Sequence, residues 1–296
     1  MKRQVQNKEY KWEHPKCAFC GSTDQALYME SSVPRWHRNQ PLRLVECNGC
    51  GLVFASPRPA IEMLHHDYLA GGPSAKTAVN RKLKRPFIGW RYRQSIKKAA
   101  RFLGYWPDRL YDMGCGAGTM LLEAKSLGIE AWGNDINKAG VDRLQALGCH
   151  VAHGFSQDVD IPRDHFDIVL NFDYLEHTYT PLDDLQRCFE MTKPGGILYL
   201  ETIYLDCVEH KKYGEAWKMF GPGHVYFFKP DVLQSMIESV GYEIVDVELA
   251  GLIVIAARRP VGARSQVRPA PRVHGKFRQA LRSAVRDVIH LATKRT

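Results

Sequence analysis

The chain contains the stretch Leu110-Tyr111-Asp112-Met113-Gly114-Cys115-Gly116-Ala117-Gly118, in which an apolar run ends in an acidic residue and a Gly-x-Gly-x-Gly turn. This pattern predicts a strand that turns tightly into a helix. Glycines let the backbone approach a ligand closely, and the N-terminus of a helix offers unpaired N–H groups. A dinucleotide fingerprint needs its third glycine at position 119, where this chain has Thr119. The spacing therefore indicates a different kind of ligand loop.

The residues after this loop alternate between helical and strand-like patterns. We expect helices over 119–127, 138–147 and 230–240, and strands over 129–134, 149–152, 166–172, 197–201, 242–249 and 252–257, with a turn at 193–196. Strands that alternate with helices predict a parallel α/β sheet. The last two strands follow each other closely, which predicts a hairpin at the end of the sheet.

Three motifs in this region resemble those of class I S-adenosylmethionine (SAM) methyltransferases and occur in the same order. They are the Asp-Met-Gly-Cys-Gly-Ala-Gly loop, Leu175-Glu176-His177 and Lys193-Pro194-Gly195-Gly196. The resemblance covers roughly Leu110 to Arg258. It implies a Rossmann-like methyltransferase sheet with a terminal antiparallel hairpin, and an enzyme that takes a methyl group from SAM.

The resemblance also implies where SAM would bind. A side chain at Gly116 would intrude on the ligand, and Asp112 would orient the loop. Asp135 ends the second strand, where a carboxylate can accept hydrogen bonds from both ribose hydroxyls, and Ile136 is placed to lie against the adenine. The predicted cofactor-binding residues are Asp112, Gly114, Gly116, Gly118, Asp135, Ile136 and Asn171.

Two Cys-x-x-Cys-Gly pairs lie near the start of the chain. They are Cys17 with Cys20 and Cys47 with Cys50, separated by 26 residues. Two such pairs supply the four thiolates of a closed tetrahedral Zn²⁺ site, so we predict a structural zinc ribbon that unfolds separately when the metal is lost. The alternative is a disulfide or redox pair. The chain opens with Met1-Lys2-Arg3-Gln4 and not with a secretory pattern, which favours a reducing cytoplasm and zinc.

A zinc ribbon placed before a SAM domain resembles a group of bacterial methyltransferases that act on sugars and other small metabolites. The stretch from Gly51 to Pro59 resembles that group too. The leading expectation is therefore O-methylation of a small hydroxylated acceptor, such as a sugar or glycan precursor. The alternatives are methylation of a quinone or other aromatic metabolite, RNA methylation with the ribbon binding RNA, and a SAM-binding module without activity. The chain has Asn171-Phe172-Asp173-Tyr174 where amino-group methyltransferases use an Asn/Asp-Pro-Pro-Tyr/Phe run, which argues against RNA base methylation.

A hydroxyl acceptor is a poor nucleophile while protonated and benefits from a base near neutrality, a role that suits histidine. The predicted catalytic residues are His224, His177 and Glu176. His177 follows the fourth strand and His224 lies on the connection after the fifth, near the strand ends that line the ligand crevice. A structural loop cap and a turn histidine are the alternative roles. Asp173, Glu176 and His177 are also similar to the acid–acid–His cluster of ubiquinone-biosynthesis O-methyltransferases, where a divalent metal is implicated, although Asp173 replaces a Glu of that family.

The charge of the chain is unevenly distributed. The formal charge is +9, yet residues 258–296 alone carry eleven Lys or Arg and one Asp, which sum to +10 and leave −1 for the rest. The body is thus not a generally basic surface, and nucleic acid is not an expected partner. A second basic cluster comprises Arg81, Lys82, Lys84, Arg85, Arg91, Arg93, Lys97, Lys98 and Arg101. It indicates either a solvated helix face or the mouth of a site for a phosphorylated or nucleotide-linked small molecule.

The C-terminal residues predict a tethered amphipathic helix. One helical face carries Phe277, Leu281, Val285, Val288 and Ala292, flanked by basic residues. Such a helix suits peripheral contact with the anionic inner face of a membrane, and docking on the body or disorder are the alternatives. The expected organisation is a zinc ribbon over 1–58, a helical connector over 59–105, the methyltransferase domain over 106–258 and a basic linker with its helix over 259–296.

Overall fold

The structure, a computed structural model, describes residues 11–32, 41–63, 73–221 and 223–262, with the backbone alone over 73–86. The predicted amphipathic helix lies outside these residues, so membrane contact stays a prediction. The side chains of Arg81, Lys82, Lys84 and Arg85 lie outside them as well. Among the described helices, none is both long and apolar enough to cross a bilayer.

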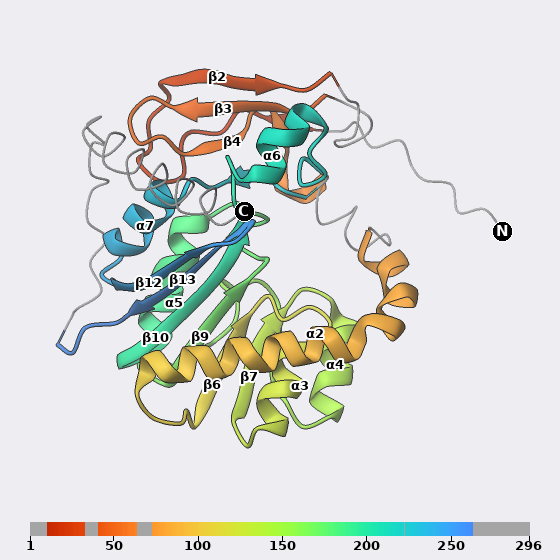
Figure 1. The fold of residues 1–296 in the computed structure, drawn as a ribbon, viewed down its shortest axis with the longest axis vertical. Coiled ribbons are helices and arrows are strands. Elements are labelled where there is room, and N and C mark those ends of the chain that lie inside the picture. Colours follow the sequence, from red (N-terminus) through yellow and green to blue (C-terminus); the bar gives the residue numbers. More distant parts are fainter. Residues whose placement is uncertain (1–10, 33–40, 64–72, 222, 263–296) are drawn as a thin grey trace, which may run out of the picture.

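A seven-stranded sheet forms the centre of the molecule (Figure 1), in the order β12-β13-β10-β9-β6-β7-β8. Six of its strands run in the same direction, and β13 runs antiparallel to both of its neighbours, β10 and β12. The strands are β6 (Arg109–Met113), β7 (Glu130–Asp135), β8 (His150–His153), β9 (Phe166–Phe172), β10 (Thr192–Ile203), β12 (Glu243–Leu249) and β13 (Leu252–Arg258). The predicted Rossmann-like sheet with a terminal hairpin is confirmed. The chain reverses its direction of winding between β6 and β9, and a crevice opens at the carboxyl ends of strands at such a point.

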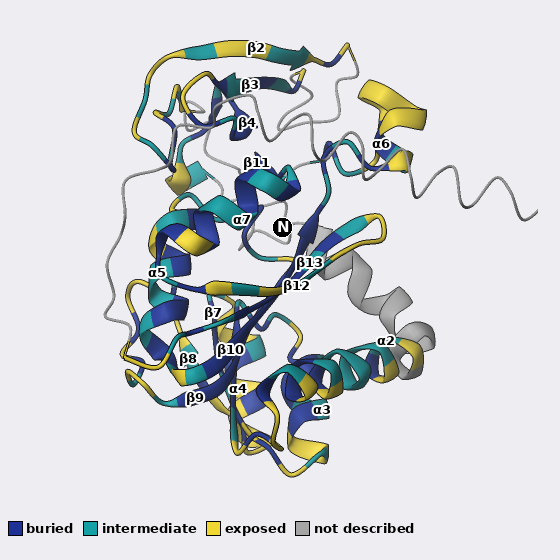
Figure 2. Ribbon diagram, turned by 60° about the vertical axis from the view of Figure 1, so that its left-hand side comes forward, coloured by how far each residue is buried: buried dark blue, intermediate teal, exposed yellow. Residues whose placement is uncertain are grey.

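Helices cover both faces of the sheet, because successive strand residues point to opposite sides. One face packs against α2 (Pro73–Leu103), α3 (Thr119–Ser126) and α4 (Lys138–Ala146). The other face packs against α5 (Pro181–Met191) and α7 (Pro230–Ser239). The parallel strands β9 and β10 are buried along most of their length (Figure 2).

Two segments of the seven-stranded sheet and its covering helices differ from the sequence-based expectation. The residues expected to form a turn at 193–196 belong to β10, which begins at Thr192 and shifts its register against β9 before Ile197. Helix α5 was not predicted, although Pro181 at its first position and Asp183 and Asp184 in its first turn are typical helix-start signals.

The N-terminal cysteine region forms a four-stranded sheet that includes one strand from much later in the chain. Its order is β11-β4-β3-β2, and β2, β3 and β4 lie at the top of Figure 1. The strands are β2 (Gln25–Glu30), β3 (Arg43–Cys47), β4 (Val53–Ala55) and β11 (Tyr226–Phe227), and a separate pair joins β1 (Trp12–Glu13) to β5 (Arg58–Pro59). Phe54 and Phe227 are fully buried in one continuous apolar cluster. The expected boundary at residue 58 therefore separates segments that share one sheet and one core.

The start of the basic tail is also part of the folded body. Arg259 is 7% exposed, and its Nη1 donates to the carbonyl oxygens of Phe189 at 2.9 Å and Thr192 at 2.6 Å. Its guanidinium lies over the Phe189 ring and pairs with Asp164. Arg259 thus closes the carboxyl end of α5, and its charge is not available to a membrane surface.

Candidate active site

The glycine loop joins β6 to α3, and its three glycines serve different purposes. Gly116 has a left-handed φ of 52°, and a Cβ there would meet only the Gly114 carbonyl oxygen, at 3.9 Å. A Cβ on Gly114 would lie 2.3 Å from the Tyr174 ring, and one on Gly118 would lie 2.2 Å from Leu144. Gly114 and Gly118 are therefore needed for packing within the protein, whereas Gly116 faces open space where a ligand can approach.

Asp135 ties the end of β7 to this loop. Its Oδ2 accepts the N–H of Gly116 at 2.8 Å, and its Oδ1 accepts the N–H of Asn137 at 2.8 Å. A carboxylate oxygen has a second lone pair, so each oxygen can still accept a ribose hydroxyl. Ile136 follows half-buried, with its carbonyl oxygen 3.1 Å from His153 Nε2. This arrangement is compatible with the predicted ribose and adenine contacts.

Asp112 lies at the end of β6 and is 5% exposed. Burial raises its pKa to about 8, and the nearby charges of Asp135 and Asp173 add to the shift. The carboxyl group is thus largely protonated near neutral pH. A cation bound beside it would favour the ionised form.

Asn171 is placed differently from the other predicted cofactor residues. It is fully buried on β9, and its amide nitrogen lies 3.7 Å from Met113 Sδ, on the α5 side of the sheet near Cys188. Its Oδ1 finds no partner among the described residues. The side chain belongs to the core, so this position does not favour direct contact with SAM.

Glu176, His177 and His224 meet beyond the carboxyl ends of β9 and β10. Their ligand atoms all lie within 4.8 Å of one another, and the two imidazole centroids are 4.6 Å apart. His177 Nδ1 lies 2.8 Å from the carbonyl oxygen of Gly223, and His224 Nδ1 lies 2.7 Å from that of Met219. A carbonyl oxygen only accepts, so each Nδ1 carries a proton and each Nε2 keeps a free lone pair.

Burial sets the protonation of this trio. Glu176 is 1% exposed, accepts the Thr202 hydroxyl at 2.7 Å, and has its pKa raised to about 7 by burial. The pKa of His224 is lowered by burial and by the neighbouring His177. His177 is exposed, and its packing against neighbouring protein lowers the pKa of its imidazole as well. Both imidazoles are therefore poised to be neutral near pH 7 and can accept a proton.

The four N-terminal cysteines gather as predicted. Their sulfur atoms all lie within 4.8 Å of one another, with Cys17–Cys50 and Cys20–Cys47 at 3.4 Å. A disulfide needs about 2.0 Å, so these are thiols, and their spacing is close to the edge of a Zn–S₄ tetrahedron. The same turn forms at both pairs, where Gly21 donates to the carbonyl of Cys17 and Gly51 to that of Cys47. This donor set fits a zinc ion with no open position.

Comparison with known proteins identifies the family of the chain. A family model described as a methyltransferase domain matches residues 87–247. The chain belongs to the SAM-dependent methyltransferase family. The ubiquinone biosynthesis O-methyltransferase of Dinoroseobacter shibae is 30% identical over 173 residues, which cover 54% of this chain and 68% of that protein. The enzyme of the same name from Nitrosococcus oceani is 30% identical over 155 residues, 46% of this chain and 64% of that protein.

Solved structures with a similar fold are more distant in sequence. Burkholderia thailandensis 1,6-didemethyltoxoflavin-N1-methyltransferase has a TM-score of 0.49 and 17% identity, and the match covers 71% of this chain and 96% of that one. Human N-acetylserotonin methyltransferase in complex with SAM has a TM-score of 0.46 and 19% identity, over 57% of this chain and 52% of that one. The curated relatives match about half of the methyltransferase described here.

The methyltransferase's Glu–His–His trio also has the donor set of a metal site, because two imidazole nitrogens and one carboxylate suit several divalent ions. Its membership differs from the acid–acid–His cluster that the sequence suggested. Asp173 is exposed and has a left-handed φ of 49°, and it is not among the three residues whose ligand atoms converge. His224, from a different segment, takes that place.

The basic residues of α2 that the structure describes are mostly paired with the methyltransferase body. Arg91 pairs with Glu201, Arg93 with Glu123, and Lys98 with Glu248. These contacts favour the structural interpretation of this stretch over the mouth of an anionic site. The Arg91–Glu201 pair was not foreseen, and it borders the active site because Glu201 lies near the carboxyl end of β10.

A cavity of about 420 Å³ lies away from the glycine loop, between the cysteine region and the start of α5. Lys16, Arg58, Asp183 and Tyr226 are among the residues that line it. None of the residues that line it belongs to the glycine loop. Sequence reasoning had no signal for Arg58 or for Tyr174 under the glycine loop, because their contacts join segments far apart in the chain.

Proposed function

We propose that the protein is an O-methyltransferase that transfers the methyl group of SAM to a hydroxyl on a small aromatic acceptor, of the quinone-precursor type. The names of relatives near 30% identity support this acceptor class. They favour it over the sugar or glycan precursor that the sequence analysis placed first, and no comparison supports a role in polysaccharide synthesis. The zinc ion is proposed as a structural ion at Cys17, Cys20, Cys47 and Cys50.

The observation that carries the proposal is the pair of imidazoles beside a buried carboxyl group. Methyl transfer is a displacement at the sulfonium carbon, and it chiefly requires that the acceptor oxygen be aligned opposite the sulfur. As the new O–C bond forms and the C–S bond breaks, the hydroxyl proton must leave. A phenolic hydroxyl, with a pKa of about 10, can pass this proton to a neutral imidazole more readily than an aliphatic alcohol can.

His224 is the proposed proton acceptor. The charge of Glu176 favours its protonated form, so an imidazolium at His224 would be stabilised as it forms. His177, whose ring stands edge-on to His224, would orient the acceptor or share the proton. Gly116 and Asp135 would hold the adenosine part of SAM, which supplies the methyl group and leaves as S-adenosylhomocysteine.

The proposal is tested by methyl transfer from labelled SAM to matched acceptors. We would offer catechols and hydroxylated benzoquinols, free and nucleotide-linked hexoses, and total RNA to the full-length zinc-loaded protein. Labelling of the aromatic set alone, with one methyl on oxygen by mass spectrometry and NMR, is the expected result. Labelling of hexoses or RNA in preference to every phenol would overturn the acceptor class.

A further inference from the structure

We propose that Arg58, from the cysteine-rich part of the chain, is a positioning residue for the paired imidazoles of His177 and His224. This inference rests on the proposed function, because it concerns how these two side chains are brought to their separation. Arg58 touches neither of them and would act through the segments that carry them.

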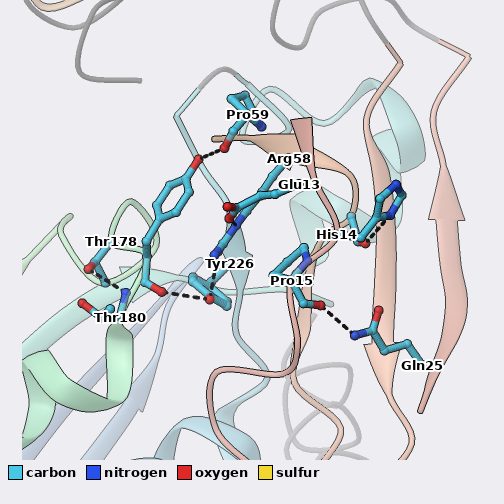
Figure 3. A network of polar contacts seen from close by, with 11 residues as sticks. Glu13, His14, Pro15, Gln25, Arg58, Pro59, Thr178, Thr180 and Tyr226 are labelled. Carbon is cyan, nitrogen blue, oxygen red and sulfur yellow. Dashed lines mark hydrogen bonds and ion pairs between the residues drawn. The ribbon is translucent and has the colours of Figure 1, made fainter. Parts of the chain in front are cut away.

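Arg58 is a buried cation (Figure 3) at the junction of the two parts of the molecule, the cysteine-rich region before residue 60 and the body built on the seven-stranded sheet. It lies on β5 and is 5% exposed. Its Nε donates to Glu13 at 2.7 Å, and its Nη1 donates to the Tyr226 hydroxyl at 3.0 Å. The flat guanidinium also lies 3.9 Å from the ring centroid of Tyr179 and 5.6 Å from that of Tyr226.

The two tyrosines have matching positions relative to the imidazoles. Tyr179 follows His177 by two residues, and Tyr226 follows His224 by two residues. The Tyr179 hydroxyl also donates to the carbonyl oxygen of Pro59 at 2.5 Å, directly after Arg58. Arg58 and its neighbour therefore hold one side chain from each of the segments that carry the two imidazoles.

The same two segments are bonded to each other on the active-site side. The N–H groups of Val225 and Tyr226 both point to the Glu176 carbonyl oxygen, at 2.8 and 3.2 Å. The N–H of Ala55, on β4, donates to the Val225 carbonyl oxygen at 2.9 Å. The segment with His177 and Tyr179 and the segment with His224 and Tyr226 are thus held on one side by their mutual bonds near the Glu–His–His trio. On the other side they are held by Arg58 and β4. A change in the spacing of the tyrosines would be passed to the imidazoles two residues away.

The chemistry of this contact requires arginine. A guanidinium can stack on one ring while it donates in its own plane to two acceptors, whereas a lysine ammonium is a point charge without a flat face. Arg58→Lys would keep the charge and the ion pair with Glu13, but it would lose the stacked plane on Tyr179. Since misplacement by about 1 Å can cost roughly a hundredfold in rate, a small change in this contact is measurable.

The test compares Arg58→Lys with Lys229→Met in the full-length, zinc-loaded protein. Lys229 also joins the two parts, through its ion pair with Glu46 at 2.9 Å, but its contacts include neither tyrosine. Zinc content, melting temperature and SAM affinity report on the fold, and kcat and KM report on catalysis. The ¹H–¹³C signals of the two imidazoles, assigned with His177→Gln and His224→Gln, report on their positions without any turnover.

For Arg58→Lys we expect retained zinc and SAM affinity, a fall in kcat of about tenfold or more with a small change in KM, and shifts of both imidazole signals. For Lys229→Met we expect a lower melting temperature with kcat and both signals unchanged. Equal loss of melting temperature in both variants, with kcat and signals unmoved in each, would show that Arg58 only joins the two parts and would overturn the inference.

A second variant keeps the inference testable if Arg58→Lys does not fold. Tyr179→Phe keeps the ring beneath Arg58 but removes its bond to Pro59, and it should shift the His177 signal more than the His224 signal. Unchanged signals there would count against the inference. If His177→Gln and His224→Gln leave kcat intact, the base assignment in the proposed function fails, and the imidazole signals still decide whether Arg58 sets their positions.

Discussion

The carboxylate of Asp135 accepts the backbone N–H of Gly116 at 2.8 Å, so the end of β7 holds the glycine loop that follows the neighbouring strand β6. This bond joins the residue predicted to bind the ribose to the one loop glycine that faces open space. Cofactor affinity and loop geometry therefore depend on the same carboxylate.

Substitutions at these two positions should weaken SAM binding without unfolding the protein. Asp135→Ala loses charge-assisted hydrogen bonds and should weaken binding by about 2–3 kcal/mol, measured by calorimetry. Gly116→Val should abolish binding, because its side chain enters the open space beside the loop, and a valine at the left-handed φ of 52° should also lower the melting temperature somewhat. Gly118→Ala is the matched control: its methyl group meets Leu144, so it should lower the melting temperature instead. Wild-type SAM affinity in both Asp135→Ala and Gly116→Val would contradict the assigned site.

SAM affinity should depend on pH through Asp112. Its pKa of about 8 means that the carboxyl group loses its proton as the pH rises toward and past 8. The ionised carboxylate attracts the positive sulfonium, so SAM affinity should increase as the pH rises through this range and should be lower at more acidic pH. Binding near pH 7 should then release protons, because the bound cation favours the ionised form of Asp112. S-adenosylhomocysteine shares the amino group but lacks the sulfonium charge, and it should show a weaker dependence. An Asp112→Asn variant with an unaltered pH profile for SAM would rule this carboxyl group out.

Loss of the proposed base should affect catalysis more than binding. His224→Gln removes the proton acceptor and should lower kcat by roughly 10²- to 10⁴-fold, while SAM affinity stays near that of the wild type. His177→Gln should have a smaller effect. The measurement is steady-state kinetics with the best phenolic acceptor, paired with calorimetry for SAM. Retained kcat in both variants would remove the base assignment.

Zinc loss should unfold more than the cysteine region. One zinc per chain is expected, and Cys47→Ser should release it. The sequence analysis expected the SAM domain to melt separately afterwards, but β11 pairs with β4 and both halves share one apolar cluster. We now expect calorimetry to show one cooperative transition at a lower temperature, with weakened order around His224. Two transitions, the upper one unchanged, would show that the two parts fold independently.

Removal of loosely bound metal should leave activity intact. Glu176, His177 and His224 could hold a divalent ion, but the proposed base mechanism needs their lone pairs free. Brief treatment with a mild chelator, with zinc analysis confirming that the four-cysteine zinc remains, should therefore not lower kcat. Activity that disappears and returns with Mn²⁺ or Mg²⁺ would instead assign the trio as a catalytic metal site.

Local sequence patterns determined a large part of this protein. The glycine loop, the strands that follow it, the terminal hairpin and the four cysteines depend on residues a few positions apart, and alternation or spacing over such distances is readable directly. The position of Asp135 could be predicted for the same reason, since it directly ends a strand. Helix α5 also has local start signals, in Pro181 and the acids of its first turn.

The tertiary structure alone decided the rest. The pairing of β11 with β4 joins segments on either side of the boundary expected at residue 58. The meeting of His177 with His224 places His224, and not Asp173, in the cluster that has the donor set of a metal site. The position of Arg58 between the two tyrosines has no trace in any local pattern. Each of these contacts joins segments far apart in the chain, and their distances are set by how the two sheets pack over a common core, which no spacing of residues along the sequence records.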